Sequence, residues 1–191
     1  MPDLNELMSR LDQLESKDAI RALCTSYAVA CDEHDMPRLM GLFTKDACFG
    51  APNGSMVAQG LDAIEAMFIE TFKNRGPAFH WTHDIVVTVD ESDPDKATGL
   101  VLSHAETSPN GVVSLAAMRY SDEYRRDQGS WQFARREIAF LYYVPATEYA
   151  VGLNQANRVV IGDQRMPADY PESLPQWQSF IDAHGPIKSG Q

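Results

Sequence analysis

Two residues far apart in the chain, Asp32 and His80, are the first candidates for catalysis. A histidine titrates near neutral pH and serves as a general base more often than any other side chain. Such a base needs an orienting partner, usually a carboxylate bonded to its second ring nitrogen. Asp32 ends a long apolar helical pattern, and His80 opens a long strand. The pair could form a proton-abstracting dyad at the mouth of a curved sheet; the alternative is a surface Asp32 and a half-buried, structural His80.

The spacing His80-x-x-His83, with Asp84 beside it, also suggests a metal site. Residues three apart on a regular strand face opposite sides of the sheet, so the two imidazoles cannot converge without a turn. Zinc would also need a third protein ligand. We therefore expect no metal site, and no other cofactor either, because the sequence carries neither a Rossmann fingerprint nor a P-loop. His34 and His184 are expected to face solvent.

The first third of the chain, which must position Asp32, has helical periodicity. Apolar residues recur at intervals of three and four over residues 4–14 and, after a polar break at residues 16–18, over residues 20–31. Helical spacing returns over residues 61–74. The sequence therefore predicts that helices come first in this domain.

From residue 78 onward the apolar period changes to two, which is typical of strands. Four long strands are predicted, over residues 80–89, 97–107, 112–125 and 131–144. Ser108-Pro-Asn-Gly111 is a hairpin turn with Asn-Gly at its tip. Helices followed by a meander of long strands predict an α+β fold with an antiparallel sheet.

The chain divides into a domain over residues 1–145 and a Pro-rich tail over residues 146–191. The tail has one short helical patch, residues 173–184, and too few apolar residues to fold alone. The large apolar side chains of this patch stand at one-turn spacing: Trp177, Phe180 and Ile181. We expect the tail to dock over the pocket mouth or onto a neighbouring subunit.

Composition argues against several classes of partner. The 191 residues include 16 Lys and Arg against 27 Asp and Glu, a formal net charge of −11, which would repel nucleic acid. No apolar run approaches the roughly 18 residues of a membrane span, and the first residues do not resemble a leader peptide. Cys24, Cys31 and Cys48 lack the spacing of a disulfide or metal framework. We expect a cytoplasmic protein without nucleic-acid or membrane partners.

Four segments carry a resemblance to a known family: residues 20–35 (IRALCTSYAVACDEHD), 42–47 (LFTKDA), 60–64 (GLDAI) and 120–133 (YSDEYRRDQGSWQF). The first three resemble the opening of SnoaL-like proteins of the nuclear transport factor 2-like superfamily. The fourth is similar to the closing hairpin of the hexachlorocyclohexane dehydrochlorinases of that group. The resemblance implies a cone-shaped α+β barrel of the cystatin-like kind. In such a barrel, N-terminal helices pack on a curved antiparallel sheet around one apolar pocket.

The same resemblance implies site residues. Scytalone dehydratase, bile acid 7α-dehydratase and the dehydrochlorinases use an Asp–His dyad, whose places are filled here by Asp32 and His80. Tyr27 stands where the bile acid dehydratase has a tyrosine and would donate to a leaving group or substrate oxygen, or else be a core residue. Arg136 matches a pocket-facing arginine of the dehydrochlorinase and would stabilise an anion, unless it is a solvated strand residue. Val101 replaces a second pocket histidine of scytalone dehydratase, so a two-histidine arrangement is not expected.

The predicted pocket wall is apolar, Met-rich and aromatic: Met40, Phe43, Met67, Phe68, Met118, Tyr120 and Phe140. Such a wall suits an aromatic or polycyclic substrate better than a sugar or phosphate. We therefore predict a cofactor-independent lyase of aromatic-compound catabolism, of the dehydratase, dehydrohalogenase or retro-aldol type. The alternatives are an isomerase or cyclase with the same proton abstraction, a non-catalytic β subunit of a ring-hydroxylating dioxygenase, and a ligand-binding protein.

Large apolar residues over 140–144 alternate along a strand, so at least two of them must point away from the pocket. Exposed apolar patches of this kind usually mark an interface. The resemblance implies a trimer, because the dehydratases and dehydrochlorinases of the group are typically trimeric. We expect a homo-oligomer, and a trimer before a dimer.

Overall fold

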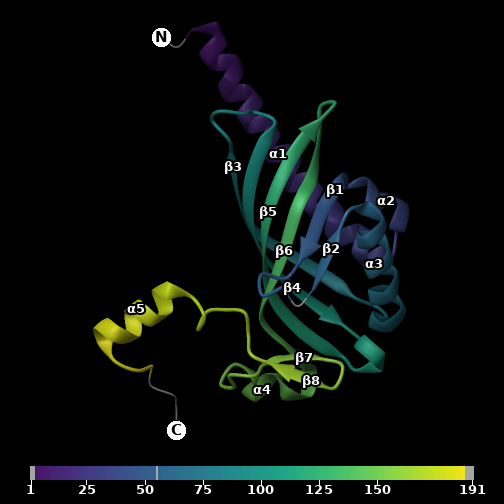
Figure 1. Cartoon of the computed structure of the whole chain (residues 1–191), viewed down its shortest axis with the longest axis vertical. Helices are drawn as coiled ribbons and strands as arrows, with labels where there is room; N and C mark the ends of the chain where they lie inside the picture. Colours follow the sequence, from purple (N-terminus) through teal and green to yellow (C-terminus); the bar gives the residue numbers. More distant parts are fainter. Residues whose placement is uncertain (1–2, 55, 188–191) are drawn as a thin grey trace.

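The structure, a computed structural model, describes residues 3–54 and 56–187. Helices precede a set of long strands, and short elements form the C-terminal part (Figure 1). The helices are α1 (Leu4–Glu33), α2 (Met36–Gly41), α3 (Leu61–Arg75), α4 (Tyr149–Gly152) and α5 (Pro175–His184). The strands are β1 (Phe43–Gly50), β2 (Val57–Gln59), β3 (Phe79–Val89), β4 (Lys96–Thr107), β5 (Ser114–Asp127), β6 (Ser130–Pro145), β7 (Val159–Ile161) and β8 (Gln164–Met166).

The strands form one curved sheet in the order β2-β1-β6-β5-β4-β3, and β7 joins it at β6 and pairs with β8. β3 to β6 form the antiparallel meander that the sequence predicts. β1 and β7, however, each run parallel to β6. The sheet is therefore mixed and not wholly antiparallel, because β1 meets β6 only after a long crossover that no local periodicity reveals. The α+β fold, with N-terminal helices packed on a curved sheet, is confirmed.

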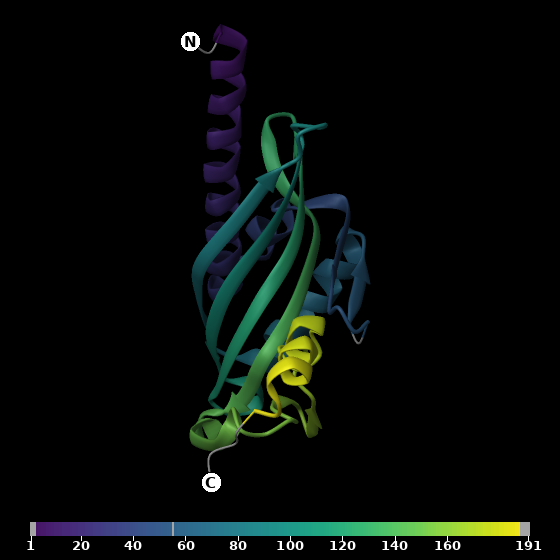
Figure 2. The ribbon, with the colours of Figure 1, turned by 90° about the vertical axis from the view of Figure 1, so that its left-hand side faces the viewer.

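The helices cover the inner face of the sheet and enclose the core. α1 packs against β3 and β6, and α3 packs against β1 and β2. Figure 2 shows α1 as a straight rod beside the long strands. The core between these layers includes Ile20, Leu39, Ile64 and Phe133, which have almost no exposed surface. None of the described helices is both long and apolar enough to cross a membrane.

α1 runs for 30 residues without the polar break expected at residues 16–18. Ser16 is buried because Arg126 of β5 reaches across to the helix, donating to Ser16 Oγ over 3.3 Å and to Asp12 Oδ1 over 2.7 Å. The helix ends at Glu33, and the next residue, His34, caps it in a left-handed conformation (φ 54°). Asp32 therefore stands in the last turn of a helix that the sheet supports along its length.

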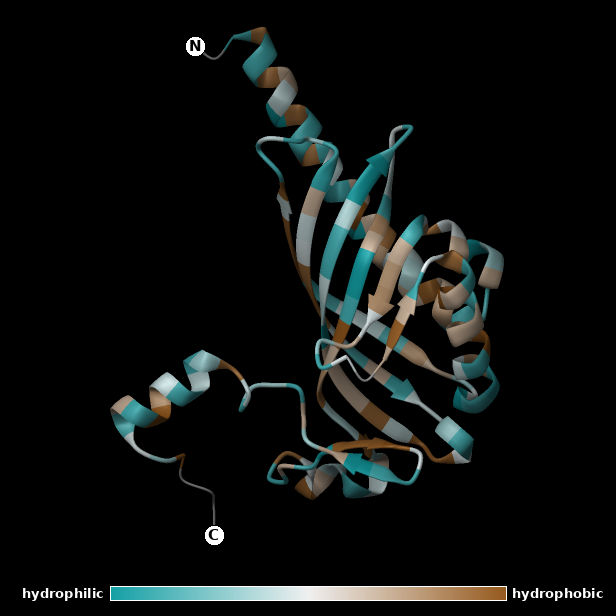
Figure 3. Ribbon diagram, in the orientation of Figure 1, coloured by the Kyte–Doolittle hydropathy of each residue, from teal (hydrophilic) through white to brown (hydrophobic). Residues whose placement is uncertain are grey.

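The first half of α1 extends beyond the sheet, and its apolar side chains are exposed (Figures 1 and 3). In Figure 3, brown apolar bands alternate with polar ones along this part of the helix. The exposed residues are Leu4, Leu7, Met8, Leu11 and Leu14. The periodicity thus identifies the helix correctly, but these side chains do not pack against the body of the chain.

Gly99 of β4 is required by the close approach of a neighbouring aromatic ring. A Cβ at this position would lie 2.8 Å from the ring and from the hydroxyl of Tyr124. Tyr124 is itself held in place, because its hydroxyl donates to Asp122 Oδ2 over 2.7 Å and contacts Cys24 Sγ at 3.5 Å.

We expect Gly99→Ala to lower the free energy of unfolding by about 1–3 kcal/mol, because the tightly bound Tyr124 ring must move to admit a methyl group. Urea denaturation measures this change. Thr98→Ala, at the exposed neighbouring position, is the control and should change stability far less. Equal stability of the Gly99→Ala variant and the parent would contradict the role of this contact.

Candidate active site

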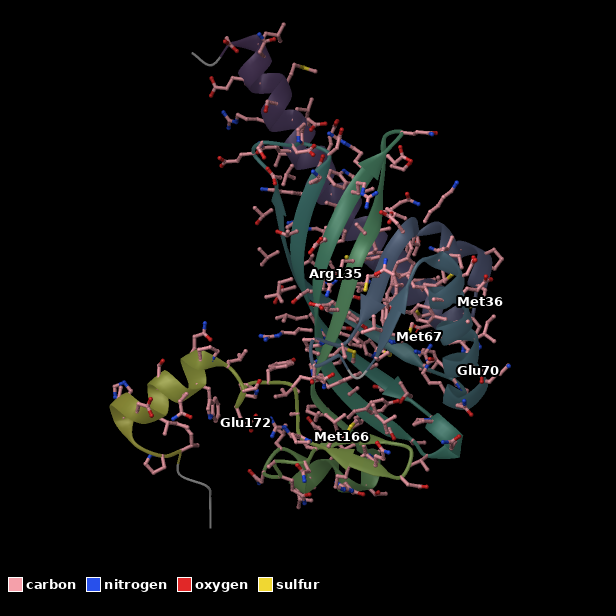
Figure 4. The ribbon with its side chains drawn as sticks, in the orientation of Figure 1. Met36, Met67, Glu70, Arg135, Met166 and Glu172 are labelled. Atoms are coloured by element: carbon pink, nitrogen blue, oxygen red, sulfur yellow. The ribbon has the colours of Figure 1, made fainter. Side chains whose placement is uncertain are left out.

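A cavity of about 630 Å³ lies between the helices and the inner face of the sheet. Its wall draws side chains from α1, α3 and every long strand of the meander, and from the C-terminal segment that contains β7 and β8. Figure 4 labels Met67 and Glu70 of α3 and Met166 of β8, three of the residues that line it. Apolar side chains predominate, and the volume is in the usual range for a small-molecule site.

Asp32 and His80 meet at this cavity. His80 Nδ1 lies 2.6 Å from Asp32 Oδ1, and the backbone N–H of His80 donates to Asp32 Oδ2 over 3.0 Å. The His80 side chain is 8% exposed and lines the cavity, while the Asp32 side chain is 20% exposed. Because an ionised carboxylate can only accept, Nδ1 donates this bond, and in the neutral form of the imidazole Nε2 is then an acceptor. The arrangement supplies an oriented general base.

Arg136 lies behind the cavity, where it supports two of its tyrosines. Its guanidinium carbon is 4.1 Å from the centroid of the Tyr27 ring and 3.9 Å from that of Tyr120, and both tyrosines line the cavity. The side chain is 1% exposed and makes an ion pair of 3.3 Å with Asp122. Strand alternation places Arg135 (labelled in Figure 4), whose side chain is exposed, on the outer face and Arg136 on the inner face.

This placement differs from the expectation that Arg136 faces the pocket. Tyr27 and Tyr120 stand between the guanidinium and the cavity, because a desolvated cation is stabilised by the faces of aromatic rings. Burial lowers the pKa of Arg136, but Asp122, together with Cys24, Tyr27 and Tyr120, outweighs this effect and raises that pKa above its usual value. The guanidinium is therefore permanently charged and acts on the cavity through the two phenols.

The two phenols are neutral at physiological pH. Burial, with contributions from Cys31 and Tyr120, raises the pKa of Tyr27 well above its usual value, and the charge of Arg136 only partly opposes this. Burial also raises the pKa of Tyr120. Tyr27 therefore keeps its phenolic proton and can act as a hydrogen-bond donor. Burial raises the pKa of the Cys31 thiol to about 11, so this group is not a thiolate nucleophile at neutral pH.

Most of the predicted wall residues border the cavity: Met67, Phe68, Met118, Tyr120 and Phe140. Phe43 and Met40 do not, and for them the prediction of a pocket wall is wrong. Phe43 begins β1 and packs in the core against the rings of Tyr27 and Phe133, at centroid distances of 6.2 and 5.3 Å. Phe49, further along β1, reaches the cavity instead.

The sequence analysis missed two parts of the site. Arg75, the last residue of α3, lines the cavity, although a cation at a helix end looks like an ordinary partner of the helix dipole. Tyr143 also lines it and shares a hydrogen bond of 2.8 Å with Thr107 Oγ1. The only advance signal for Arg75 was its position just before the Gly76-Pro77 break that precedes His80.

His83 faces away from His80, on the outer side of the sheet. Its Nε2 lies 2.8 Å from Nδ1 of His104 on β4, at an exposed position. Within residues 3–54 and 56–187, no three His, Cys, Asp or Glu side chains gather as a metal site would require. His34 stacks on Phe72 at 4.5 Å, and His184 lies on α5.

An oriented acid–base pair that opens into an apolar cavity of an α+β cone defines a class of small-molecule enzymes and binding proteins. The SnoaL-like domain model matches residues 12–137, and the chain belongs to this family. Gamma-hexachlorocyclohexane dehydrochlorinase of Sphingobium indicum is 25% identical over 146 residues, which are 72% of this chain and 88% of that protein.

Solved structures give the same result for the fold. A type 2 hexachlorocyclohexane dehydrochlorinase has a TM-score of 0.65 at 21% identity and covers 71% of this chain and 92% of its own. A nuclear transport factor 2-like protein with a cystatin-like fold from Novosphingobium aromaticivorans has a TM-score of 0.59 at 28% identity, over 74% of this chain and 92% of its own. The predicted family and superfamily are thereby confirmed.

The His83–His104 pair makes stability depend on pH. Burial and the neighbouring His83 lower the pKa of His104 below its ordinary value of 6.5. Below about pH 6.5, His104 is therefore protonated to a smaller extent in the folded protein than in the unfolded chain. The free energy of unfolding thus decreases as the pH falls through this range. We expect the melting temperature to fall on acidification through this window, and to fall less in His104→Gln.

Thermal melts at a series of pH values measure the effect, and His184→Gln on exposed α5 is the control. The same acid dependence in the parent and in His104→Gln would contradict this assignment.

Proposed function

We propose that this protein is a cofactor-independent lyase that acts on an apolar aromatic or polycyclic small molecule by proton abstraction. The observation that carries the proposal is the two-point contact of Asp32 with His80 at the wall of an apolar cavity. The 25% identity to a dehydrochlorinase supports an elimination. Dehydration, dehydrohalogenation and retro-aldol cleavage all begin with such a proton transfer.

His80 Nε2 takes the proton from carbon or from a hydroxyl of the substrate. Asp32 stabilises the imidazolium that forms and keeps the ring oriented. Tyr27 donates to the departing group or to the oxygen on which negative charge develops. Arg136 assists indirectly, because its charge lies against the ring faces of Tyr27 and Tyr120. No step needs a metal or an organic cofactor, and we place the enzyme in the cytoplasm, with aromatic compounds as its substrate class.

A ligand-binding protein or a dioxygenase β subunit would use the same cavity without needing the dyad. A half-buried carboxylate–imidazole pair contributes little to an otherwise apolar wall. An isomerase or cyclase would use the dyad in the same way and differ only in the fate of the carbanion. Loss of turnover on disabling Asp32 therefore separates the enzymes from the two non-catalytic alternatives.

We expect Asp32→Asn to reduce turnover by about 100-fold or more, because the amide cannot hold His80 in the required tautomer or stabilise its imidazolium. The assay tests γ-hexachlorocyclohexane, the compound in the relative's name, with halogenated and hydroxylated cyclic compounds. The melting temperature should change little. Glu33→Gln, the adjacent exposed carboxylate, is the matched control and should keep full activity. Full activity of Asp32→Asn would remove the dyad from the mechanism.

We also propose that the chain forms a homo-oligomer, a trimer before a dimer, in which the C-terminal arm contacts a neighbouring subunit. α5 projects away from the sheet (Figure 1), and Phe180 on it is 53% exposed. Trp81 and Leu102 on the outer face of the sheet are also exposed. These apolar groups need a partner surface that the single chain does not supply.

Light scattering should show an oligomer for the full chain and a smaller species for a chain ending near Ala146. A second shortened chain, ending at Ser173, removes α5 but keeps the β7–β8 segment that lines the cavity. It should lose the oligomer and keep ligand binding. A monomer for the full chain, with unchanged activity after shortening, would contradict both parts.

A further inference from the structure

We propose that Arg75 binds a carboxylate substituent of the substrate, so that the ligand of this cavity is an aromatic or alicyclic carboxylic acid. The proposal rests on the proposed function only in using the same cavity. It specifies one chemical feature of the ligand that the dyad alone does not define.

Arg75 is held at the cavity wall by two contacts that leave most of its donors unused. One terminal nitrogen donates to the carbonyl oxygen of Cys31 over 3.1 Å. The guanidinium carbon lies 4.9 Å from the centroid of the Phe72 ring. Both contacts restrict the orientation of the side chain without neutralising its charge, so the guanidinium is preorganised for a ligand.

The charge of Arg75 has no carboxylate partner within ion-pair distance among the described residues. Its Nε is buried and has no acceptor there. The two acidic residues that line the same cavity are engaged elsewhere. Glu70 pairs with Lys73 at 2.7 Å, and Asp169 accepts from the backbone N–H of Phe140 at 2.8 Å. Of the described residues that line the cavity, Arg75 is the one Lys or Arg side chain, and it has no counter-ion among them.

A cation without an anion is unfavourable beside an apolar cavity, and a carboxylate on the ligand would neutralise it. A carboxylate matches the planar guanidinium, because its two oxygens accept parallel hydrogen bonds from two of its nitrogens. This match matters in a chain of net charge −11, which otherwise disfavours anionic ligands. The charge of Arg75 also acts inside the cavity: burial raises the pKa of Tyr143, and Arg75 opposes that rise.

The position of Arg75 relative to the dyad determines how such a ligand would lie. Arg75 binds the carbonyl of Cys31, and His80 binds the side chain of the next residue, Asp32. Two consecutive residues of α1 thus hold the cation and the base on one wall of the cavity. A molecule whose carboxylate binds Arg75 places its ring against the apolar wall, with ring carbons near His80. Arg75 would be a specificity-determining residue, and His80 the base.

The alternative is that Arg75 only stabilises the ends of α1 and α3, by bonding the Cys31 carbonyl and by interacting with the helix dipole. In that case its loss would lower the melting temperature and would affect charged and neutral ligands equally. The two roles are separated by comparing a carboxylate with a neutral molecule of the same shape.

The test measures binding of 1-naphthoate and 1-naphthamide to the full-length protein by calorimetry at neutral pH, and needs no turnover. We expect the parent to bind naphthoate at least about tenfold more tightly than naphthamide. Arg75→Met should abolish this preference and leave naphthamide affinity unchanged, while Arg75→Lys should keep part of it. Arg21→Met, an exposed arginine of α1, is the control for loss of one charge and should keep the full preference.

Three outcomes would overturn the proposal: equal affinity of the parent for the two probes, no saturable binding of naphthoate, or a preference that survives in Arg75→Met. If Arg75→Met does not fold, Arg75→Lys serves as the test. The proposal is then contradicted if Arg75→Lys keeps the full preference for naphthoate or loses it completely. Asp32→Asn separates this proposal from the proposed function, because that variant should lose turnover and keep the preference for naphthoate. If Asp32→Asn keeps both turnover and the preference for naphthoate, the proposed role of the dyad is wrong and the proposed role of Arg75 stands.

Discussion

The two hydrogen bonds from His80 to the carboxylate of Asp32 join a feature of the fold and the proposed chemistry at one point. One bond comes from the backbone at the start of β3 and the other from the imidazole. The backbone bond attaches the end of α1 to the first strand of the meander, and the ring bond fixes the imidazole at the cavity wall. Because a half-buried carboxylate without donors is costly, the packing of α1 on β3 and the orientation of the base are not independent. Any change that shifts the end of α1 also shifts the base.

A second constraint is the buried charge of Arg136. An ion pair removed from water loses hydration energy that its mutual attraction recovers only in part. Here three aromatic rings add to that attraction: the guanidinium carbon lies 3.9 to 4.3 Å from the centroids of Tyr27, Tyr120 and Phe133. The cavity therefore meets neutral phenols with a cation behind them. A phenol supported in this way donates a stronger hydrogen bond to a developing anion, and the cation itself stays away from solvent.

The sequence predicted what is local and what the family shares. Periodicity identified α1, α3 and the four long strands, and the resemblance indicated that Asp32 and His80 belong together. Long-range pairing was not accessible: β1 runs parallel to β6, and Phe43 therefore lies in the core instead of the pocket wall. Arg136 was expected at the pocket surface. Strand alternation correctly predicts that its side chain lies on the inner face, but not that Tyr27 and Tyr120 lie between it and the cavity. Arg75 was missed because its one signal, the Gly76-Pro77 break that follows it, is equally typical of a cation at an ordinary helix end.

In the proposed proton transfer, each new charge would form beside a group of opposite charge or a hydrogen-bond donor, and this is what a small apolar cavity needs in order to support it. Before transfer, the Asp32 carboxylate accepts two hydrogen bonds from His80, and an anionic ligand would pair with Arg75 at the cavity wall. After transfer, the imidazolium of His80 would lie 2.6 Å from Asp32, and the new negative charge would form on a ligand in the cavity that His80 and Tyr27 both line. Each new charge forms beside a partner that was already oriented, so little rearrangement is required in a medium that solvates ions poorly. An apolar wall then favours the reaction, because it excludes the water that would otherwise weaken these attractions.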